Sequence, residues 1–377
     1  MYIYLCGVFN GPVTGQLQTL LGIEEALKKN YCLKKVKYPP LSIFFLFSWL
    51  IFITKTVFIF ANNRDTFYMV IHRSRLSFWL RDLPIFVIAS IHKSKIICHL
   101  VGSDIEEFVK GSSFLEKFLL KKFFSNIRSW ILLGDSMNEQ VVRSYKYLEI
   151  ENNSKCFNQG KLSSYFLRGY YPDETKLYIK DSFINEKILK FGSNLKISFM
   201  SNLMEDKGIV EFIESMIYLR EENDINIEVF IAGAIIENSS DRLEKTLKKA
   251  SEKSYISFLG LVQGKEKWEL LSETDIFILP TYYKTEALPL SLIEAMKFGC
   301  LCISSNIGEI NDLLKDGRGI IMEDVNTKNL VDTIKLAISD TDSSKSKMIN
   351  SFNYADMNFS YKTYQKNLID IIERHVD

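Results

Sequence analysis

Short apolar runs alternate with longer stretches of helical periodicity along most of the chain. In the first half, strand-like runs fall at residues 2–8, 66–72, 95–100 and 130–133. Between them apolar positions recur at helical spacing, and the expected helices are 15–29, 43–60, 77–92, 113–124 and 136–147. Strands that alternate with helices in this way indicate a parallel sheet covered by helices.

The alternation weakens between residues 150 and 195 and then begins again. The second set of strands is expected at 195–200, 225–233, 256–260, 275–280 and 300–305. The helices between and after them are expected at 208–221, 239–253, 264–272, 289–298, 327–337 and 359–375. The chain therefore predicts two α/β domains, residues 1–185 and 186–355. The segment 356–377 is expected to cross back to the first domain as a helix.

Composition agrees with two such domains and excludes some functions. A chain of 377 residues, 47% of them hydrophobic, can bury a core in each domain. Its net charge of +1 argues against a nucleic-acid binder, which usually carries a basic excess. The six cysteines form no CxxC pair and no zinc spacing, so they are interpreted as core residues. The sequence opens on an apolar run without a basic segment, so we expect no secretory signal and a cytoplasmic location.

The run LSIFFLFSWLIFITKTVFIF, residues 41–60, is long and apolar enough to be considered for a membrane span. Strand-like runs lie on both sides of it, and a single crossing would separate two strands of one sheet. We therefore expect a helix that is partly buried and partly faces lipid. The stretch 114–130 mixes aromatic residues with lysines and arginine. It is either a matching surface for anionic lipid or a core-facing helix with a solvated basic face.

In the first half, unusual residues follow two of the expected strands. Ligands of open parallel sheets bind at the carboxyl ends of strands. In FNGPVTGQ, Gly11 and Gly15 bracket a turn into a helix, where backbone N–H groups can approach a ligand. The spacing is not GxGxxG, and by itself it favours a structural tight turn. His99 ends the strand in IICHLVGSDI and is either a satisfied core residue or a functional one.

In the second half, TEALPLSLIEAMKFG (285–299) places two carboxylates around the start of a helix. Pro289 suits the first helical turn and Gly299 the C-terminal end. Glu286 is then a loop residue, and Glu294 points back toward the helix start from one to two turns inside. A helix N-terminus attracts anions. Lys207, in FMSNLMEDKG after another strand, can neutralise a diphosphate as a point charge.

These motifs together resemble a known family. FMSNLMEDKG, ISFLGLV, DIFILP, the E-x7-E pair Glu286 and Glu294, and FGCLCISSNIGEINDLL follow one another in the order found in retaining GT-B glycosyltransferases of family 4. The resemblance covers most of residues 195–325 and extends more loosely to GPVTG and HLVGSD. It implies an α/β protein of GT-B type, with two Rossmann-like parallel-sheet domains facing across a cleft.

The resemblance also implies roles for individual residues. Glu286 would contact hydroxyls of the donor sugar, Glu294 the ribose, and Lys207 the diphosphate. Three backbone N–H groups would hold the distal phosphate, those near Leu288, Leu290 and Ser291. The expected catalytic residues are Lys207, Glu286 and His99.

Other residues complete the expected donor site, and two positions depart from the family pattern. Gly15, in the turn over the phosphates, and Gly260, in ISFLGLV, belong to the expected site. Asn202, also assigned there, stands where many members have an arginine, which leaves more of the diphosphate charge to Lys207. Pro289 stands where other members have a glycine, which removes one N–H donor.

The implied activity is transfer of a hexose-type sugar from a UDP- or GDP-sugar with retention of configuration. No carboxylate in these motifs is placed as a nucleophile, and the resemblance implies front-face attack. We expect no cofactor, and no metal, because Lys207 and the helix dipole can replace a divalent ion. From the apolar stretches we expect a lipid-linked saccharide acceptor in capsule or O-antigen synthesis. The enzyme itself is expected to be peripherally associated with the inner face of the cell membrane. Three alternatives stay open: a soluble sugar acceptor, a non-catalytic nucleotide-sugar-binding subunit, and a Rossmann oxidoreductase, which the missing GxGxxG disfavours.

Overall fold

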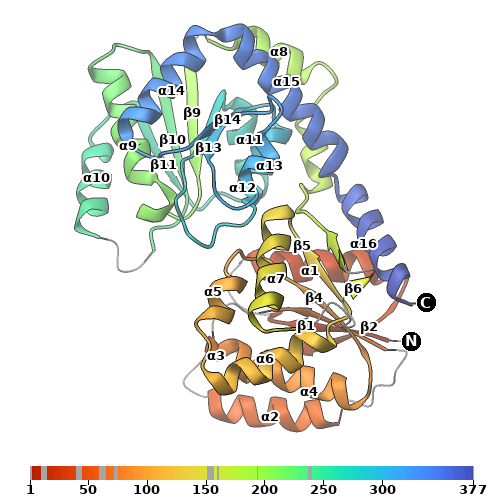
Figure 1. The fold of residues 1–377 in the computed structure, drawn as a ribbon. Coiled ribbons are helices and arrows are strands. Elements are labelled where there is room, and N and C mark those ends of the chain that lie inside the picture. The colour runs from red at the N-terminus through yellow and green to blue at the C-terminus, as the bar shows by residue number, and fades with distance from the viewer. Residues whose placement is uncertain are drawn as a thin grey trace. The chain divides into compact units, whose positions relative to one another are not determined.

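The structure is a computed structural model, and it forms two compact units. It describes residues 2–9, 15–39, 45–58, 65–71, 75–150, 157–158, 161–192, 194–236 and 240–376. Unit 1 comprises Met1–Arg168 and Tyr364–Asp377, and unit 2 comprises Gly169–Thr363. Each unit has its own parallel sheet with helices on both faces, as Figure 1 shows.

The sheet of unit 1 has six parallel strands in the order β2-β1-β3-β4-β5-β8. They are β1 (Tyr2–Gly7), β2 (Cys32–Lys37), β3 (Thr66–Val70), β4 (Lys95–His99), β5 (Ser129–Leu132) and β8 (Ser164–Phe166). The four strands predicted in this half are confirmed. The two that the pattern missed are the edge strands: β2 reads CLKKVK and is largely exposed, and β8 has three residues. A short hairpin, β6 (Phe157–Asn158) and β7 (Lys161–Leu162), stands apart from this sheet.

The helices of unit 1 form two layers. They are α1 (Gly15–Leu27), α2 (Phe45–Val57), α3 (Arg75–Ser77), the π-helical turn η1 (Phe78–Asp82), α4 (Leu83–Ile91), α5 (Ile105–Lys110), α6 (Phe114–Asn126) and α7 (Asp135–Tyr147). The chain steps from β1 to β2 in one direction and from β2 to β3 in the other. Right-handed crossovers therefore place α1 on one face of the sheet and α2, α4 and α6 on the other (Figure 1). Among the described residues no helix has both the length and the apolar character to cross a bilayer, and α2 has 13 residues.

The sheet of unit 2 has the order β11-β10-β9-β12-β13-β14, and all its pairs are parallel. Its strands are β9 (Leu195–Met200), β10 (Ile227–Ala232), β11 (Ile256–Gly260), β12 (Ile276–Leu279), β13 (Leu301–Ser305) and β14 (Ile320–Met322). The first five were predicted, and the three-residue β14 was missed. In chain order this is 3-2-1-4-5-6, so the direction in which strands are added reverses between β9 and β12.

The helices and 3₁₀ turns of unit 2 are η2 (Asp173–Leu177), α8 (Phe183–Lys190), η3 (Glu205–Lys207), α9 (Ile209–Glu221), α10 (Asp241–Ser251), α11 (Gly264–Glu273), α12 (Leu290–Lys297), α13 (Ile310–Leu314), α14 (Thr327–Ser339) and α15 (Thr341–Asn358). A last helix, α16 (Tyr361–Val376), begins in unit 2 and continues in unit 1. The sequence pattern missed three of the α-helices: α8, α13 and α15. The sequence of α15 is mostly polar, and it buries only small or isolated side chains, so no apolar stripe announces it.

The division between the units differs from the predicted boundary at residue 185. Residues 169–185 cluster with unit 2. The backbone N–H of Tyr171 donates to the carbonyl of Phe359, and Trp268 Nε1 donates to a carboxylate oxygen of Glu174 at 2.8 Å. At the other end, α16 belongs to unit 1 from Tyr364 onward.

Candidate functional site

The reversal of strand order in unit 2 lies between the strands that precede two of the predicted site residues. In open parallel sheets, ligands bind outside the carboxyl ends of the strands at such a point. Lys207 lies in the connection after β9, and Glu286 lies in the connection after β12. The topology alone therefore brings the cation and the first acid to one edge of the sheet.

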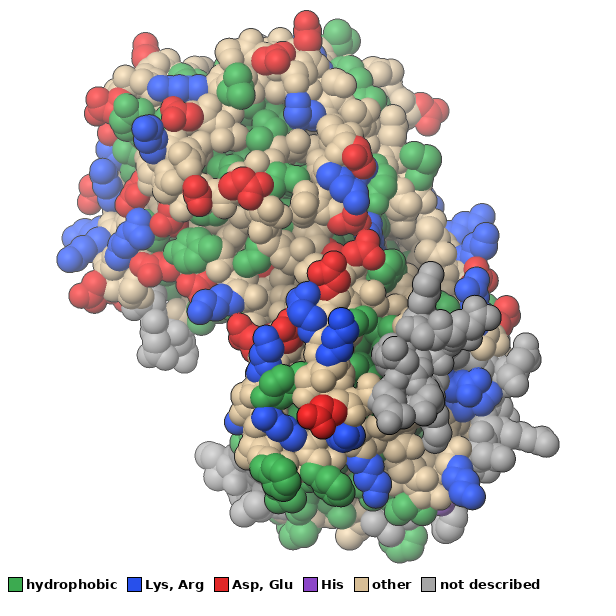
Figure 2. All heavy atoms as spheres, viewed as in Figure 1, with side chains coloured by type: hydrophobic (Ala, Val, Ile, Leu, Met, Phe, Trp, Pro, Cys, Tyr) green, Lys and Arg blue, Asp and Glu red, His purple; other side chains and the backbone are tan. Residues whose placement is uncertain are grey.

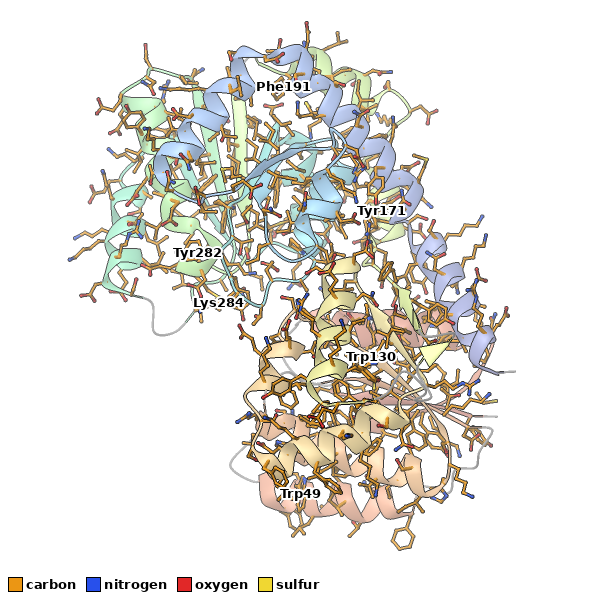
Figure 3. All side chains as sticks on the ribbon, in the orientation of Figure 1. Trp49, Trp130, Tyr171, Phe191, Tyr282 and Lys284 are labelled. Carbon is orange, nitrogen blue, oxygen red and sulfur yellow. The ribbon has the colours of Figure 1, made fainter. Side chains whose placement is uncertain are left out.

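A glycine fixes the connection after β9 against the end of β12. Gly208 has φ +75°, and a Cβ there would come within 2.0 Å of the carbonyl oxygen of Pro280. No other residue fits this close approach without moving backbone. The neighbouring N–H of Tyr282 donates to the carbonyl of Asp206 at 2.8 Å. These contacts hold Lys207, the residue before Gly208, beside the loop that follows β12, in which Figure 3 labels Tyr282 and Lys284.

Lys207 and Glu286 form an ion pair between Nζ and Oε2. Only 13% of the lysine side chain and 10% of the glutamate side chain are exposed. The hydroxyl of Thr281 lies 3.4 Å from the same carboxylate oxygen, and Lys207 Nζ lies 4.7 Å from the ring centroid of Tyr283. The cation is thus held in a largely dry setting, where a negatively charged group within reach interacts with it strongly.

The second acid, Glu294, also has a lysine partner. Its Oε1 accepts a hydrogen bond from Lys267 Nζ at 2.6 Å, and both side chains are largely buried. Lys267 lies on α11, with its Nζ 4.2 Å from the ring centroid of Trp268. Burial raises the pKa of the Glu294 carboxyl, and the Lys267 ammonium opposes that rise.

The helix that carries Glu294, α12, starts one residue later than predicted. Pro289 is the N-cap of α12 and has extended backbone, and its carbonyl accepts the N–H groups of Leu292 and Ile293. The N–H groups of Leu290 and Ser291 come before the first bonded N–H group of the helix, that of Leu292, and have no intrahelical partner. Gly299 ends the helix with φ +63°, as the sequence predicted.

The loop that carries Glu286 packs against the loop after β13. A Cβ on Gly308 would come within 2.3 Å of the carbonyl oxygen of Glu286. The N–H of Glu309 donates to the carbonyl of Ala287 at 2.7 Å. Leu288, the next residue, is buried. Residues 306–309 therefore pack against the backbone of the loop that carries Glu286 and help to fix its position.

The remaining predicted residues of unit 2 lie on more open positions. Asn202 is exposed, two residues after β9. Gly260 ends β11 with φ +66°, and no atom lies within 4 Å of where its Cβ would be. Its carbonyl accepts the N–H of Gly233 at 2.7 Å. Neither residue contacts the Lys207–Glu286 pair through a side chain in the described contacts.

Two predicted residues belong to unit 1. Gly15 is the first residue of α1, and the rest of the GPVTG turn, Gly11 included, lies outside the described residues. His99 ends β4, is 1% exposed, and shares a hydrogen bond of 2.9 Å between Nδ1 and the hydroxyl of Tyr68. Burial lowers the pKa of His99 to about 3, so its imidazole is neutral near pH 7. His99 Nε2 has no partner within the described part of the chain.

Sequence reasoning missed Lys267 and Thr281. Thr281 could have been noticed, because it follows the strand DIFILP at the reversal point. Lys267 has no such signal, since it is one of two lysines in the helical stretch GKEKWELL. Among the described residues no group of three His, Cys, Asp or Glu side chains is arranged to hold a metal ion.

Residues 181–353 match the model of a family described as "Glycosyl transferases group 1". This match and the relatives below support glycosyltransferase activity for the chain. The matched segment lies entirely in unit 2 and includes Lys207, Glu286, Glu294 and Lys267.

Curated relatives of this glycosyltransferase are distant. The chain is 24% identical over 344 residues to an uncharacterized glycosyltransferase, MJ1069, of Methanocaldococcus jannaschii, with 90% of this chain and 82% of that one covered. It is 29% identical over 148 residues to the Escherichia coli UDP-Gal:alpha-D-GlcNAc-diphosphoundecaprenol alpha-1,3-galactosyltransferase. This match covers 38% of this chain and 37% of that one. It is 24% identical over 177 residues to the capsular polysaccharide biosynthesis glycosyltransferase CapH of Staphylococcus aureus, which covers 46% and 39%.

Solved structures share the fold of this glycosyltransferase. HepE of Anabaena, in complex with UDP and glucose, gives a TM-score of 0.69 at 13% identity, with 99% of this chain and 100% of that chain covered. WaaG, a glycosyltransferase involved in lipopolysaccharide biosynthesis, gives a TM-score of 0.59 at 14% identity. This match covers 98% of this chain and 99% of that chain. The expected GT-B class, with two six-stranded parallel sheets, is therefore confirmed.

Proposed function

We propose that this glycosyltransferase is a retaining enzyme of family 4 that takes a hexose-type sugar from a UDP- or GDP-sugar. The observation that carries the proposal is the Lys207–Glu286 pair at the reversal of strand order, four residues before the first turn of α12. A lysine and a helix N-terminus suit a diphosphate. HepE, solved with UDP-glucose, supports the same ligand class.

We propose that donor binding breaks the Lys207–Glu286 ion pair, which frees the Glu286 carboxylate to bind the sugar. Without donor, the ammonium of Lys207 balances the carboxylate of Glu286. A diphosphate carries more negative charge and competes for that ammonium. Once Lys207 turns to the phosphate, Glu286 accepts hydrogen bonds from the sugar hydroxyls. Glu294, held by Lys267, is proposed to accept the ribose hydroxyls in the same way.

The proposed reaction is a front-face transfer. The acceptor oxygen bonds to the anomeric carbon on the face from which the phosphate departs, and the carbon–oxygen bond to the phosphate breaks. The acceptor proton passes to the departing phosphate oxygen. The chain's contribution is orientation of the donor and stabilisation of charge on the diphosphate by Lys207 and by the N–H groups of Leu290 and Ser291. His99 is proposed to contact the sugar as a neutral imidazole, and no metal is required.

For the acceptor we propose a lipid-linked saccharide used in capsule or O-antigen synthesis on the cytoplasmic side of the membrane. The names of two relatives support this class, since one transfers to a diphosphoundecaprenol-linked sugar and the other makes capsular polysaccharide. A soluble sugar acceptor is the alternative. The exposed Asn202, in place of a phosphate-binding arginine, favours a second alternative, a non-catalytic nucleotide-sugar-binding subunit.

The test is a thermal-shift screen of the full chain against UDP-, GDP- and ADP-sugars, followed by turnover of the stabilising donor with a lipid-linked saccharide. The anomeric configuration of the product is read by NMR. We expect stabilisation by one nucleotide class, loss of that effect in Lys207→Ala, and a product with the donor's configuration. Inversion would refute the retaining mechanism. Binding without turnover on any acceptor would favour the non-catalytic subunit, and no binding would overturn the proposal.

A further inference from the structure

Large apolar side chains are exposed on one helical layer of unit 1. The layer consists of α2, α3, α4 and α6, which lie on one face of the sheet or beside it (Figure 1). Its exposed apolar residues are Phe47, Leu50, Ile51, Phe58, Leu76, Val87, Ile91, Phe114, Leu115 and Phe118. Scattered apolar residues are normal on a protein surface, but a contiguous set of this size marks an interaction site.

On α2 the exposed residues form one stripe. Leu50 and Ile51 lie three and four positions after Phe47, and Phe58 continues the stripe just beyond the helix end. Phe47 and Phe58 are 69% and 71% exposed. Phe52, on the other face, is buried against the protein. A surface helix normally turns polar residues outward, so α2 has an apolar stripe on the side that ordinarily faces water.

On α6 an apolar half and a basic half share one outward face. Phe114 is 91% exposed and Phe118 is 63% exposed. Lys121 and Lys122 follow Phe118 by three and four positions, so they lie on the same face one turn further along. The opposite face, with Phe123, is buried. Aromatic residues beside lysines on one helix face are typical of helices that lie in a membrane interface.

Direct contacts join these helices into one layer. Trp49 Nε1 of α2, labelled in Figure 3, donates to the carbonyl of Leu80 in η1 at 2.6 Å. Trp79 Nε1 of η1 donates to Glu116 Oε1 of α6 at 2.8 Å. The ring centroids of Phe86 in α4 and Phe123 in α6 are 4.5 Å apart. The exposed stripes therefore belong to one continuous face, which we call the α2–α4–α6 face.

This layer carries a strong positive excess. Residues 45–58, 75–93 and 113–128 hold eight basic side chains and two acidic ones, whereas the whole chain has a net charge of +1. Seven of the basic residues are at least partly exposed, namely Lys55, Arg75, Lys93, Lys117, Lys121, Lys122 and Arg128, and the eighth, Arg81, is buried. The two acids are Asp82, which is fully buried, and Glu116, which is engaged in a capping box with Ser113. In unit 1, Figure 2 shows hydrophobic side chains beside Lys and Arg side chains over α2 and α6.

We propose that the α2–α4–α6 face binds the surface of an anionic lipid bilayer. Its aromatic and aliphatic side chains enter the boundary between headgroups and acyl chains, and Lys121 and Lys122 contact lipid phosphates. Charge complementarity selects this occupant, because a second copy of the same face would bring two positive surfaces together. The inference rests on the proposed function only for its purpose, which is to bring the enzyme to a lipid-linked acceptor.

The test is sedimentation of the full chain with phosphatidylcholine vesicles, with and without phosphatidylglycerol. We expect binding only when phosphatidylglycerol is present, and weaker binding at high salt. Lys121→Glu combined with Lys122→Glu should weaken binding about 25-fold or more, because each lysine near an anionic surface contributes roughly fivefold. Phe47→Ser combined with Phe118→Ser should weaken it as well.

Matched controls lie on unit 2. Lys248→Glu with Lys249→Glu changes two exposed neighbouring lysines of α10, and Leu336→Ser with Met357→Ser changes two exposed apolar residues. All variants should melt within a few degrees of the wild type, and the controls should keep wild-type vesicle binding. Equal losses in the control and α6 charge variants would overturn the proposal.

Other outcomes separate the remaining occupants. Absence of wild-type binding to phosphatidylglycerol vesicles overturns the proposal, and so does equal binding to neutral vesicles. A wild-type dimer in analytical ultracentrifugation that Phe118→Ser dissociates, without any vesicle binding, would assign the face to a second copy. Nucleotide-sugar stabilisation is measured in the same variants. Vesicle binding without stabilisation by any nucleotide sugar would contradict the proposed function but support the membrane-binding face. Stabilisation by a nucleotide sugar without vesicle binding would support the proposed function but contradict the membrane-binding face.

Discussion

The lysines of the candidate site in unit 2 differ in burial and pairing from those of the α2–α4–α6 face in unit 1. In unit 2, Lys207 and Lys267 are largely buried, and each is paired with an acid of the candidate site. On the α2–α4–α6 face of unit 1, lysines lie exposed beside apolar side chains, and no acidic partner of Lys121 or Lys122 occurs among the described residues. Buried pairs suit recognition of one small ligand in a fixed geometry. An exposed basic and apolar surface suits an extended partner without fixed geometry.

The largest effect is expected when the buried cation Lys207 is removed from the candidate site in unit 2. Lys207→Ala should lower kcat about 100- to 1,000-fold, because a charge that stabilises the departing diphosphate is lost. Steady-state kinetics with the preferred donor measures the loss, and a thermal melt checks the fold. Normal turnover in a folded variant would show that the paired lysine is only structural.

Changing the acid of the same pair should have a smaller effect. Glu286→Gln keeps the shape but loses a charged acceptor for sugar hydroxyls, and we expect kcat/KM to fall about 10- to 100-fold. Calorimetric titration with the nucleoside diphosphate alone should change much less than transfer. If diphosphate binding and transfer fell equally, Glu286 and Glu294 would have exchanged roles.

The second pair can be examined through pH. Burial raises the pKa of Glu294, and Lys267 lowers it in opposition. The carboxylate, which is proposed to accept ribose hydroxyls, is therefore lost as the pH falls through this raised pKa. In Lys267→Met the opposing contribution is gone, so the pKa rises further. We expect the acid limb of donor binding to move to higher pH, and an unmoved limb would mean that Lys267 does not hold Glu294 ionised.

The smallest effect is expected when a positive charge is added at Asn202, in the proposed donor site. Asn202→Arg places a guanidinium where family members often have one, at an exposed position after β9. Donor binding should tighten severalfold, because a charge-assisted hydrogen bond to phosphate becomes available. Competition calorimetry gives the affinity. Weaker binding would indicate that the asparagine side is closed to the phosphates.

The sequence predicted most of the fold because buried parallel strands are apolar runs between helices. It failed where that signal is absent: β2 exposes its lysines, β8 and β14 have three residues each, and α15 is mostly polar. The site was predicted in the same uneven way. Lys207, Glu286 and Glu294 stand at motif positions, whereas the two ion pairs depend on how strands far apart in sequence meet. Nothing near Lys267 in the sequence distinguishes it from Lys265.

The exposed face of unit 1 was predicted in part. The helix 43–60 and the stretch 114–130 were assigned to it from composition, and α2 and α6 occupy them. The contribution of Leu76, Val87 and Ile91 could not be predicted, because a run as apolar as LPIFVIASI gives no indication of which side remains uncovered. Docking of α2, η1 and α6 through two tryptophans determines that side.

Calorimetry that compares a nucleoside diphosphate with its parent nucleoside tests the central claim most directly. UDP and uridine, or GDP and guanosine, are titrated into the wild type and into Lys207→Met. We predict that the diphosphate binds the wild type far more tightly than the nucleoside, and that most of this difference disappears in the variant. A diphosphate preference that is unchanged by the loss of Lys207 would contradict the account.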